Sequence, residues 1–121
     1  MRLFALRGAV TVQRNDSQLI LEATTELMQE IMERNALAPR DAVSCIFTLT
    51  EDLDAQFPAV AARAVGFGDV PLLCAREIPV PGSMPRVIRV LLHYNAPADH
   101  SPVHVYLREA QALRADLSSA Q

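Results

Sequence analysis

Two arginines lie inside segments whose alternating pattern is typical of β-strands. Alternation places Arg7 on an otherwise apolar face of residues 3–10, and Arg89 on a mainly apolar face of residues 86–94. A guanidinium keeps its charge, and burying it without an anionic partner is costly. Neither segment contains a carboxylate. The partner is therefore either an acidic residue from elsewhere in the fold or an anionic ligand.

Further arginines extend this pattern. Lysine is absent, so all 11 basic residues are arginine, and each offers a planar fork suited to binding a carboxylate. Taken singly, an arginine such as Arg63 or Arg114 is more often part of a structural ion pair than a ligand contact. Together with Glu77 and Cys74, the four arginines predict a site for a small polyanion.

Residues for most other catalytic chemistry do not occur in a usable pattern. The sequence has no Ser/His/Asp arrangement and no phosphate-binding glycine loop, and its 2 cysteines and 3 histidines lack metal-ligand spacing. We therefore expect neither a metal nor a cofactor. The three histidines, His93, His100 and His104, are expected to be structural or exposed.

Length and composition narrow the class of protein. The chain has 121 residues, which predicts one domain over residues 1–121 with a tail from about Arg114. The net charge of -3 and the lack of a basic run argue against nucleic-acid binding. No segment resembles a signal peptide or a membrane span, so Cys45 and Cys74 are expected to be free thiols in the cytoplasm.

Hydrophobic periodicity predicts five strands and two helices. The first helix is expected to begin at the N-cap chemistry of Asn15, Asp16 and Ser17, and the second at Pro58, because proline is favourable in the first turn of a helix. The predicted strands cover residues 2–13, 42–50, 70–78, 86–94 and 103–113, and the predicted helices cover residues 17–36 and 58–66.

These elements predict an α+β domain, a five-stranded mixed sheet with two helices on one face. The strands carry apolar residues on both faces, and no further helix is expected to bury the second face. We therefore expect subunits to associate into a closed homo-oligomer.

Six motifs in order then identify a family. The sequence contains RGAVTV, FPA followed by an arginine, CARE, RVIRV, HVYL and LRADL, which together span nearly the whole chain. This series resembles the monofunctional chorismate mutases of the AroH type. The resemblance implies a homotrimeric pseudo-α/β-barrel with active sites between neighbouring subunits.

The resemblance also implies roles for individual residues. Arg89 and Glu77 match the catalytic positions. The implied substrate-binding residues are Arg7, Phe57, Ala59, Arg63, Leu73, Cys74, Tyr106 and Arg114. One departure is Val60, where the family often has lysine.

The implied reaction is the pericyclic rearrangement of chorismate to prephenate in phenylalanine and tyrosine biosynthesis. On this interpretation the substrate is the missing anion: Arg7 binds a carboxylate, and Arg89 stabilises the ether oxygen as its bond breaks. Two alternatives stay open, a trimeric imine deaminase of the RidA type and a non-catalytic trimer that binds a metabolite.

Overall fold

The computed structural model describes residues 1–116, with side chains as far as residue 114. The elements in chain order are β1 (Arg2–Thr11), α1 (Ser17–Asn35), η1 (Pro39–Asp41), β2 (Ala42–Leu49), α2 (Pro58–Ala62), η2 (Arg63–Phe67), β3 (Leu72–Arg76), β4 (Val87–Ala96), β5 (Val105–Leu107) and η3 (Arg108–Asp116).

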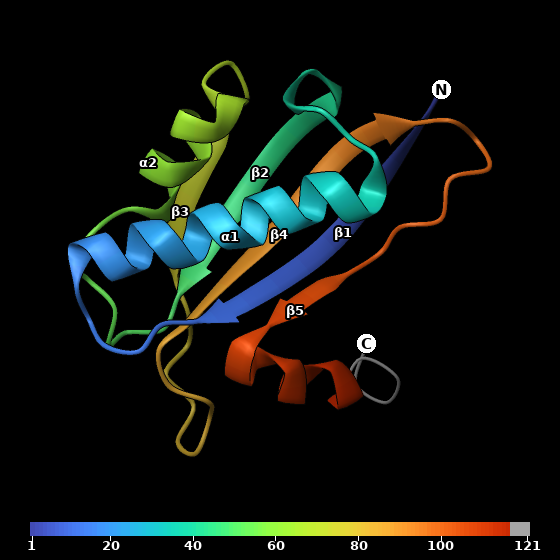
Figure 1. The fold of residues 1–121 in the computed structure, drawn as a ribbon. Coiled ribbons are helices and arrows are strands. Elements are labelled where there is room, and N and C mark those ends of the chain that lie inside the picture. Colours follow the sequence, from blue (N-terminus) through green and yellow to red (C-terminus); the bar gives the residue numbers. More distant parts are fainter. Residues whose placement is uncertain (117–121) are drawn as a thin grey trace.

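The five strands form one sheet in the order β3-β2-β4-β1-β5. Strand β4 is antiparallel to both β1 and β2, whereas the outer pairs β2–β3 and β1–β5 are parallel. Helix α1 crosses one face of the sheet and α2 lies beside β3 (Figure 1). The predicted α+β fold with a five-stranded mixed sheet is therefore confirmed.

Helix α1 forms where the sequence predicts it. The Asp16 side chain caps its first turn by accepting a hydrogen bond from the Leu19 N–H at 3.0 Å. Its apolar positions, Ile20, Leu27 and Ile31 among them, are fully buried against the sheet. This face of the sheet therefore carries the main hydrophobic core.

The last predicted strand, residues 103–113, is wrong beyond its first half. Strand β5 ends at Leu107, and the chain then turns into the 3₁₀ helix η3. Arg108 has a φ of 57°, which no strand residue adopts. The turn is held by Thr11, whose hydroxyl accepts from the Glu109 N–H at 3.2 Å and whose carbonyl accepts from the Arg108 guanidinium at 3.2 Å.

Helix η3 also changes the expectation for the second face of the sheet. Ala110 and Leu113 of η3 pack against Ala9, Val87 and Tyr106, all on the face opposite α1. One end of that face is thus covered by the chain's own helix, contrary to the prediction. Arg114 belongs to η3, and the rest of the predicted tail, residues 117–121, lies outside the described residues.

The packing between α1 and β1 depends on a glycine. A Cβ atom on Gly8 would lie 3.1 Å from Ile31 Cδ1, Val90 Cγ1 and the Val105 carbonyl oxygen. Gly8 therefore permits a close approach of helix to sheet directly beside Arg7.

We predict that Gly8→Ala lowers the free energy of unfolding by about 1–3 kcal/mol, because the added methyl overpacks the core. The matched control is Gly68→Ala, where φ is -63° and an added methyl would meet no atom within 4 Å. Urea unfolding at one fixed protein concentration measures both. Equal effects of the two substitutions would contradict the argument.

Candidate active site

Arg7 and Arg89 project from the face of the sheet opposite α1, which we call the open face. Its residues on the two central strands include Arg7 and Ala9 of β1 and Arg89 and Leu91 of β4, with Ala9 opposite Arg89 and Arg7 opposite Leu91. Both arginines are half-buried. The prediction placed each arginine on a mainly apolar face of its own segment, and the register shows that these are the same face of the sheet.

Arg89 has an anionic partner within the protein, so the first of the two alternatives, an acidic residue from elsewhere in the fold, holds for this arginine. Its Nε donates to Glu77 Oε2 at 3.0 Å, and the same oxygen accepts from the Thr48 hydroxyl at 2.6 Å. The Arg89 side chain is 41% exposed and that of Glu77 is 16% exposed. The expectation that only the substrate would partner Arg89 is therefore wrong, because an acidic residue arrives from the segment after β3.

The ion pair leaves much of the guanidinium available. Only Nε of Arg89 is bonded to Glu77, and neither terminal nitrogen has a hydrogen bond to a side chain or backbone within residues 1–116. The backbone of Glu77 is itself fixed, because its N–H donates to the Leu49 carbonyl at 2.9 Å. Glu77 thus orients the cation without occupying its outer edge.

The sheet register brings other predicted residues beside Arg89. Ala9 lies between Arg89 on β4 and Tyr106 on β5, so the three residues form a row across the open face. Arg7 lies in the next row, where Leu73 occupies the far end on β3 through the pairings across β2 and β4. Arg7, Leu73, Glu77, Arg89 and Tyr106 therefore share the open face.

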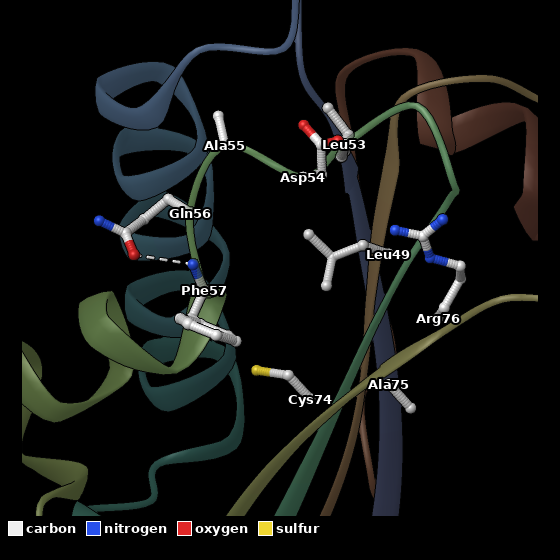
Figure 2. A pocket seen from close by; sticks show the side chains of 9 residues that line it. All are labelled: Leu49, Leu53, Asp54, Ala55, Gln56, Phe57, Cys74, Ala75 and Arg76. Carbon is white, nitrogen blue, oxygen red and sulfur yellow. Dashed lines mark hydrogen bonds between the residues drawn. The ribbon is translucent and has the colours of Figure 1, made fainter.

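Phe57 and Cys74 belong to a different place, a hollow of about 320 Å³ at the β3 edge, here called the β3 pocket. It is lined by Leu49, Leu53, Asp54, Ala55, Gln56, Phe57, Cys74, Ala75 and Arg76. Figure 2 shows the Phe57 ring and the Cys74 sulfur facing each other across this pocket. The Phe57 side chain is 67% exposed.

Adjacent residues of β3 thus serve opposite faces. Cys74 pairs with Phe47, which is fully buried in the core beneath α1, whereas Leu73 pairs with Ile46 on the open face. We call Arg89, Glu77 and Thr48 the Arg89 cluster. Within one chain the sheet separates this cluster from the β3 pocket. The structure does not bring the predicted site residues together into one cavity of a single subunit.

Three further predicted residues belong to neither place. Ala59 is in the main core with 6% exposure and does not line the β3 pocket. Arg63 begins η2 and is exposed, and Arg114 is exposed on η3.

Sequence reasoning missed three polar residues near these places. Thr48 bonds Glu77, Arg76 lines the β3 pocket, and His104 accepts a hydrogen bond from the Arg7 backbone N–H at 3.0 Å. The alternation of residues 42–50 could have indicated Thr48, since it places Thr48 and the buried Phe47 on opposite faces of the sheet. The contact of His104 joins residues 97 apart in the sequence, and no local pattern indicates it.

Among residues 1–116, no cluster of His, Cys, Asp and Glu side chains is suited to hold a metal ion. No helix in that part of the chain is long and apolar enough to cross a membrane. Both cysteines are free.

The two thiols differ in environment. Cys45 is buried in the core, and burial, together with the nearby Cys74, raises its pKa to about 12. Cys74 is half-buried at the β3 pocket.

We predict that Cys45 resists alkylation in the folded protein. With a pKa of about 12, only about one Cys45 side chain in ten thousand is a thiolate at pH 8. Thiol titration with an aromatic disulfide at pH 8 should detect Cys45 only after urea is added. Cys74→Ser leaves Cys45 as the single thiol, and rapid native labelling of that variant would contradict the prediction.

Comparisons with known proteins indicate the family of the chain. The family model for chorismate mutase type I matches residues 3–117. The chain is 52% identical to chorismate mutase AroH of Thermus thermophilus over 118 residues, 96% of this chain and 97% of the relative. It is 38% identical to chorismate mutase AroH of Bacillus subtilis over 120 residues, 98% and 94% of the two chains.

A solved structure gives the same result for the fold. A chorismate mutase from Clostridium thermocellum superimposes with a TM-score of 0.86 at 45% identity, covering 90% of this chain and 98% of that one. The family model and the relatives extend over nearly the full length, and the resemblance noted in the sequence is confirmed. The chain belongs to the chorismate mutase type I family.

Proposed function

We propose that the Arg89 cluster on the open face carries out the chorismate mutase reaction, the rearrangement of chorismate to prephenate. Family membership supports an isomerase, and the names of the relatives support this substrate and product. Neither the imine deaminase nor the non-catalytic metabolite binder finds support in these comparisons. One observation carries the proposal. The Arg89 guanidinium on strand β4 is oriented by Glu77 through Nε alone, which leaves its terminal nitrogens able to donate to a substrate.

The reaction needs no general acid or base. It breaks one C–O bond and forms one C–C bond within a single molecule, and no proton is transferred. An enzyme can accelerate such a step by holding the flexible enolpyruvyl arm in its compact geometry and by stabilising the charge that separates. Fixed cations suit both tasks.

We assign to Arg89 the role of stabilising the negative charge that develops on the ether oxygen. Its Nε is engaged by Glu77, so the terminal nitrogens are directed by that bond. A donor aimed at the position where charge develops stabilises the transition state more than the ground state. Glu77 then has two duties, to orient Arg89 and to offset positive character on the ring of the substrate.

The other predicted residues bind the dianion. Arg7 and Tyr106 lie on the open face beside Arg89 and are assigned to the substrate carboxylates. Leu73 and Phe57 are assigned to the apolar wall and Cys74 to a weak hydrogen bond, whereas the buried Ala59 is assigned to the packing behind Phe57. The assigned role of Arg63 and Arg114, both exposed, is to attract the dianion and close over it.

We further propose a homotrimer in which each site joins the open face of one subunit to the β3 pocket of a neighbour. The two places lie on opposite sides of the sheet in one chain, so a second copy is required to unite them. The open face also carries apolar surface that association would cover, including Leu3 at 56% and Leu73 at 60% exposure. A closed ring of identical contacts satisfies both conditions. The free thiols of Cys45 and Cys74 support a cytoplasmic location.

Removing the central cation should abolish most turnover. Arg89→Ala is expected to lower kcat by about a hundred- to a thousandfold, the usual effect of losing one charge-stabilising donor. Arg89→Lys should also be impaired, because an ammonium lacks the fork that reaches Glu77 and the substrate together. The assay follows the loss of chorismate absorbance with formation of prephenate. Arg40→Ala, an exposed arginine on η1, is the control, and near-native turnover by Arg89→Ala refutes the mechanism.

Complementation between defective subunits tests the shared site. One variant carries Arg89→Ala and the other carries Phe57→Ala with Arg63→Ala, so each destroys a different half. Every mixed trimer contains one site with two intact halves, and random mixing in equal amounts should restore about a quarter of wild-type activity. The variants are unfolded together in urea and refolded, with separately refolded samples as the control. Activity no higher than the mean of the two separate samples would show that the halves do not come from neighbouring subunits.

A further inference from the structure

His104 contacts the backbone of a residue assigned to the substrate. The Nδ1 atom of His104 accepts a hydrogen bond from the Arg7 N–H at 3.0 Å. The parallel ladder between β1 and β5 begins at Gly8 and Val105, so Arg7 and His104 lie just outside it. The imidazole therefore satisfies the Arg7 N–H at the point where the β1–β5 ladder has ended.

The segment that carries His104 is anchored by a buried side chain, that of Asn35. The Asn35 side chain at the end of α1 is 4% exposed and clamps the backbone of Val103. Its Oδ1 accepts from the Val103 N–H at 2.8 Å, and its Nδ2 donates to the Val103 carbonyl at 3.0 Å. Pro102 restricts the backbone immediately before this clamp. His104 thus follows a fixed residue although the loop is on the surface.

The contact requires a neutral imidazole. Nδ1 accepts the hydrogen bond from the Arg7 N–H, so it carries no proton and the ring proton resides on Nε2. Burial and the charge of Arg7 lower the pKa of His104 below its ordinary value, which favours the same form.

We propose that His104 is a positioning residue for Arg7. The bond holds the Arg7 N–H on the β5 side, while the residues that flank Arg7, Leu6 and Gly8, are paired with β4 on the other side. The backbone held in this way fixes the point on the open face from which the Arg7 side chain extends. This inference rests on the proposed function, in which Arg7 binds a substrate carboxylate, and small displacements of such a group cost much of its binding.

A double-mutant cycle tests the inference. His104→Ala should lower kcat/KM roughly five- to tenfold, mainly through KM, because one hydrogen bond to Arg7 is lost. His104→Asn should recover most of that loss, since its Oδ1 can accept from the same N–H. In the Arg7→Ala background, His104→Ala should change kcat/KM by less than about twofold, because a residue that acts through Arg7 has no effect once Arg7 is gone. Val103→Ala, which keeps the backbone clamp, is the control for disturbance of the loop.

Several outcomes would overturn the inference while leaving the proposed function intact. They are an unchanged kcat/KM for His104→Ala, and an equal loss in the presence and absence of the Arg7 side chain. Failure of the wild-type protein to convert chorismate would instead contradict the proposed function.

A second measurement needs neither turnover nor a folded alanine variant. Amide hydrogen exchange of the wild-type protein should show the Arg7 N–H protected, as expected for a bonded strand amide. Exchange of that N–H as fast as an exposed loop amide would overturn the inference. In a folded His104→Ala variant the protection should fall at Arg7 and persist at Gly8.

Discussion

The sheet can carry a charged guanidinium on its middle strand only because one of its faces is free of α-helices. Strand β4 is paired on both sides, by β2 and by β1, so its backbone is among the most constrained in the molecule. Alternation sends Ile88 and Val90 into the core and Arg89 to the open face. Placing Arg89 beneath α1 instead would cost several kcal/mol in lost hydration. The position of the cation thus determines which face of the sheet remains open.

The interactions around the Arg89 guanidinium fix its orientation more than they stabilise the fold. Arg89 is 41% exposed, so its bond to Glu77 is expected to contribute only about 0–1 kcal/mol to folding. The same bond selects one orientation of a long side chain, because Glu77 is itself held by Thr48 and by the Leu49 carbonyl. Such preorganisation removes rearrangement at the moment when charge develops. The contact between His104 and Arg7 follows the same principle at the neighbouring strand.

Local periodicity explains how much was predictable from the sequence. The extents of β1, α1 and β4 follow from alternation and from the amphipathic pattern, whereas the shared face of Arg7 and Arg89 depends on the register between β1 and β4. The end of β5 does not, because it depends on the positive φ of Arg108 and on bonds to Thr11, distant in sequence. The Glu77 partner was missed for a related reason: its contact with Arg89 joins two segments, and alternation within a segment does not say which segments lie near each other.

The arginines, Glu77 and Cys74 were singled out from the sequence itself, the other site residues came from the resemblance, and the division of the set between two faces became clear only from the register. A strand period of two sends Leu73 and Cys74 to opposite sides of the sheet, although the resemblance assigns both to the substrate. That assignment to faces required knowing which strand neighbours β3 and which of its faces α1 covers.

Association would complete the electrostatics as well as the shape of the proposed site. In one chain the Arg89 guanidinium is in contact with water, where an ion at 4 Å attracts it by only about 1 kcal/mol. Covering the open face with a neighbour's β3 pocket removes water and lowers the effective dielectric constant, and at a value of about 20 the same attraction is about 4 kcal/mol. The apolar residues that drive association, such as Leu73, lie on the same face as the cation. Burial of apolar surface and strengthening of the catalytic charge would therefore be consequences of a single contact between subunits.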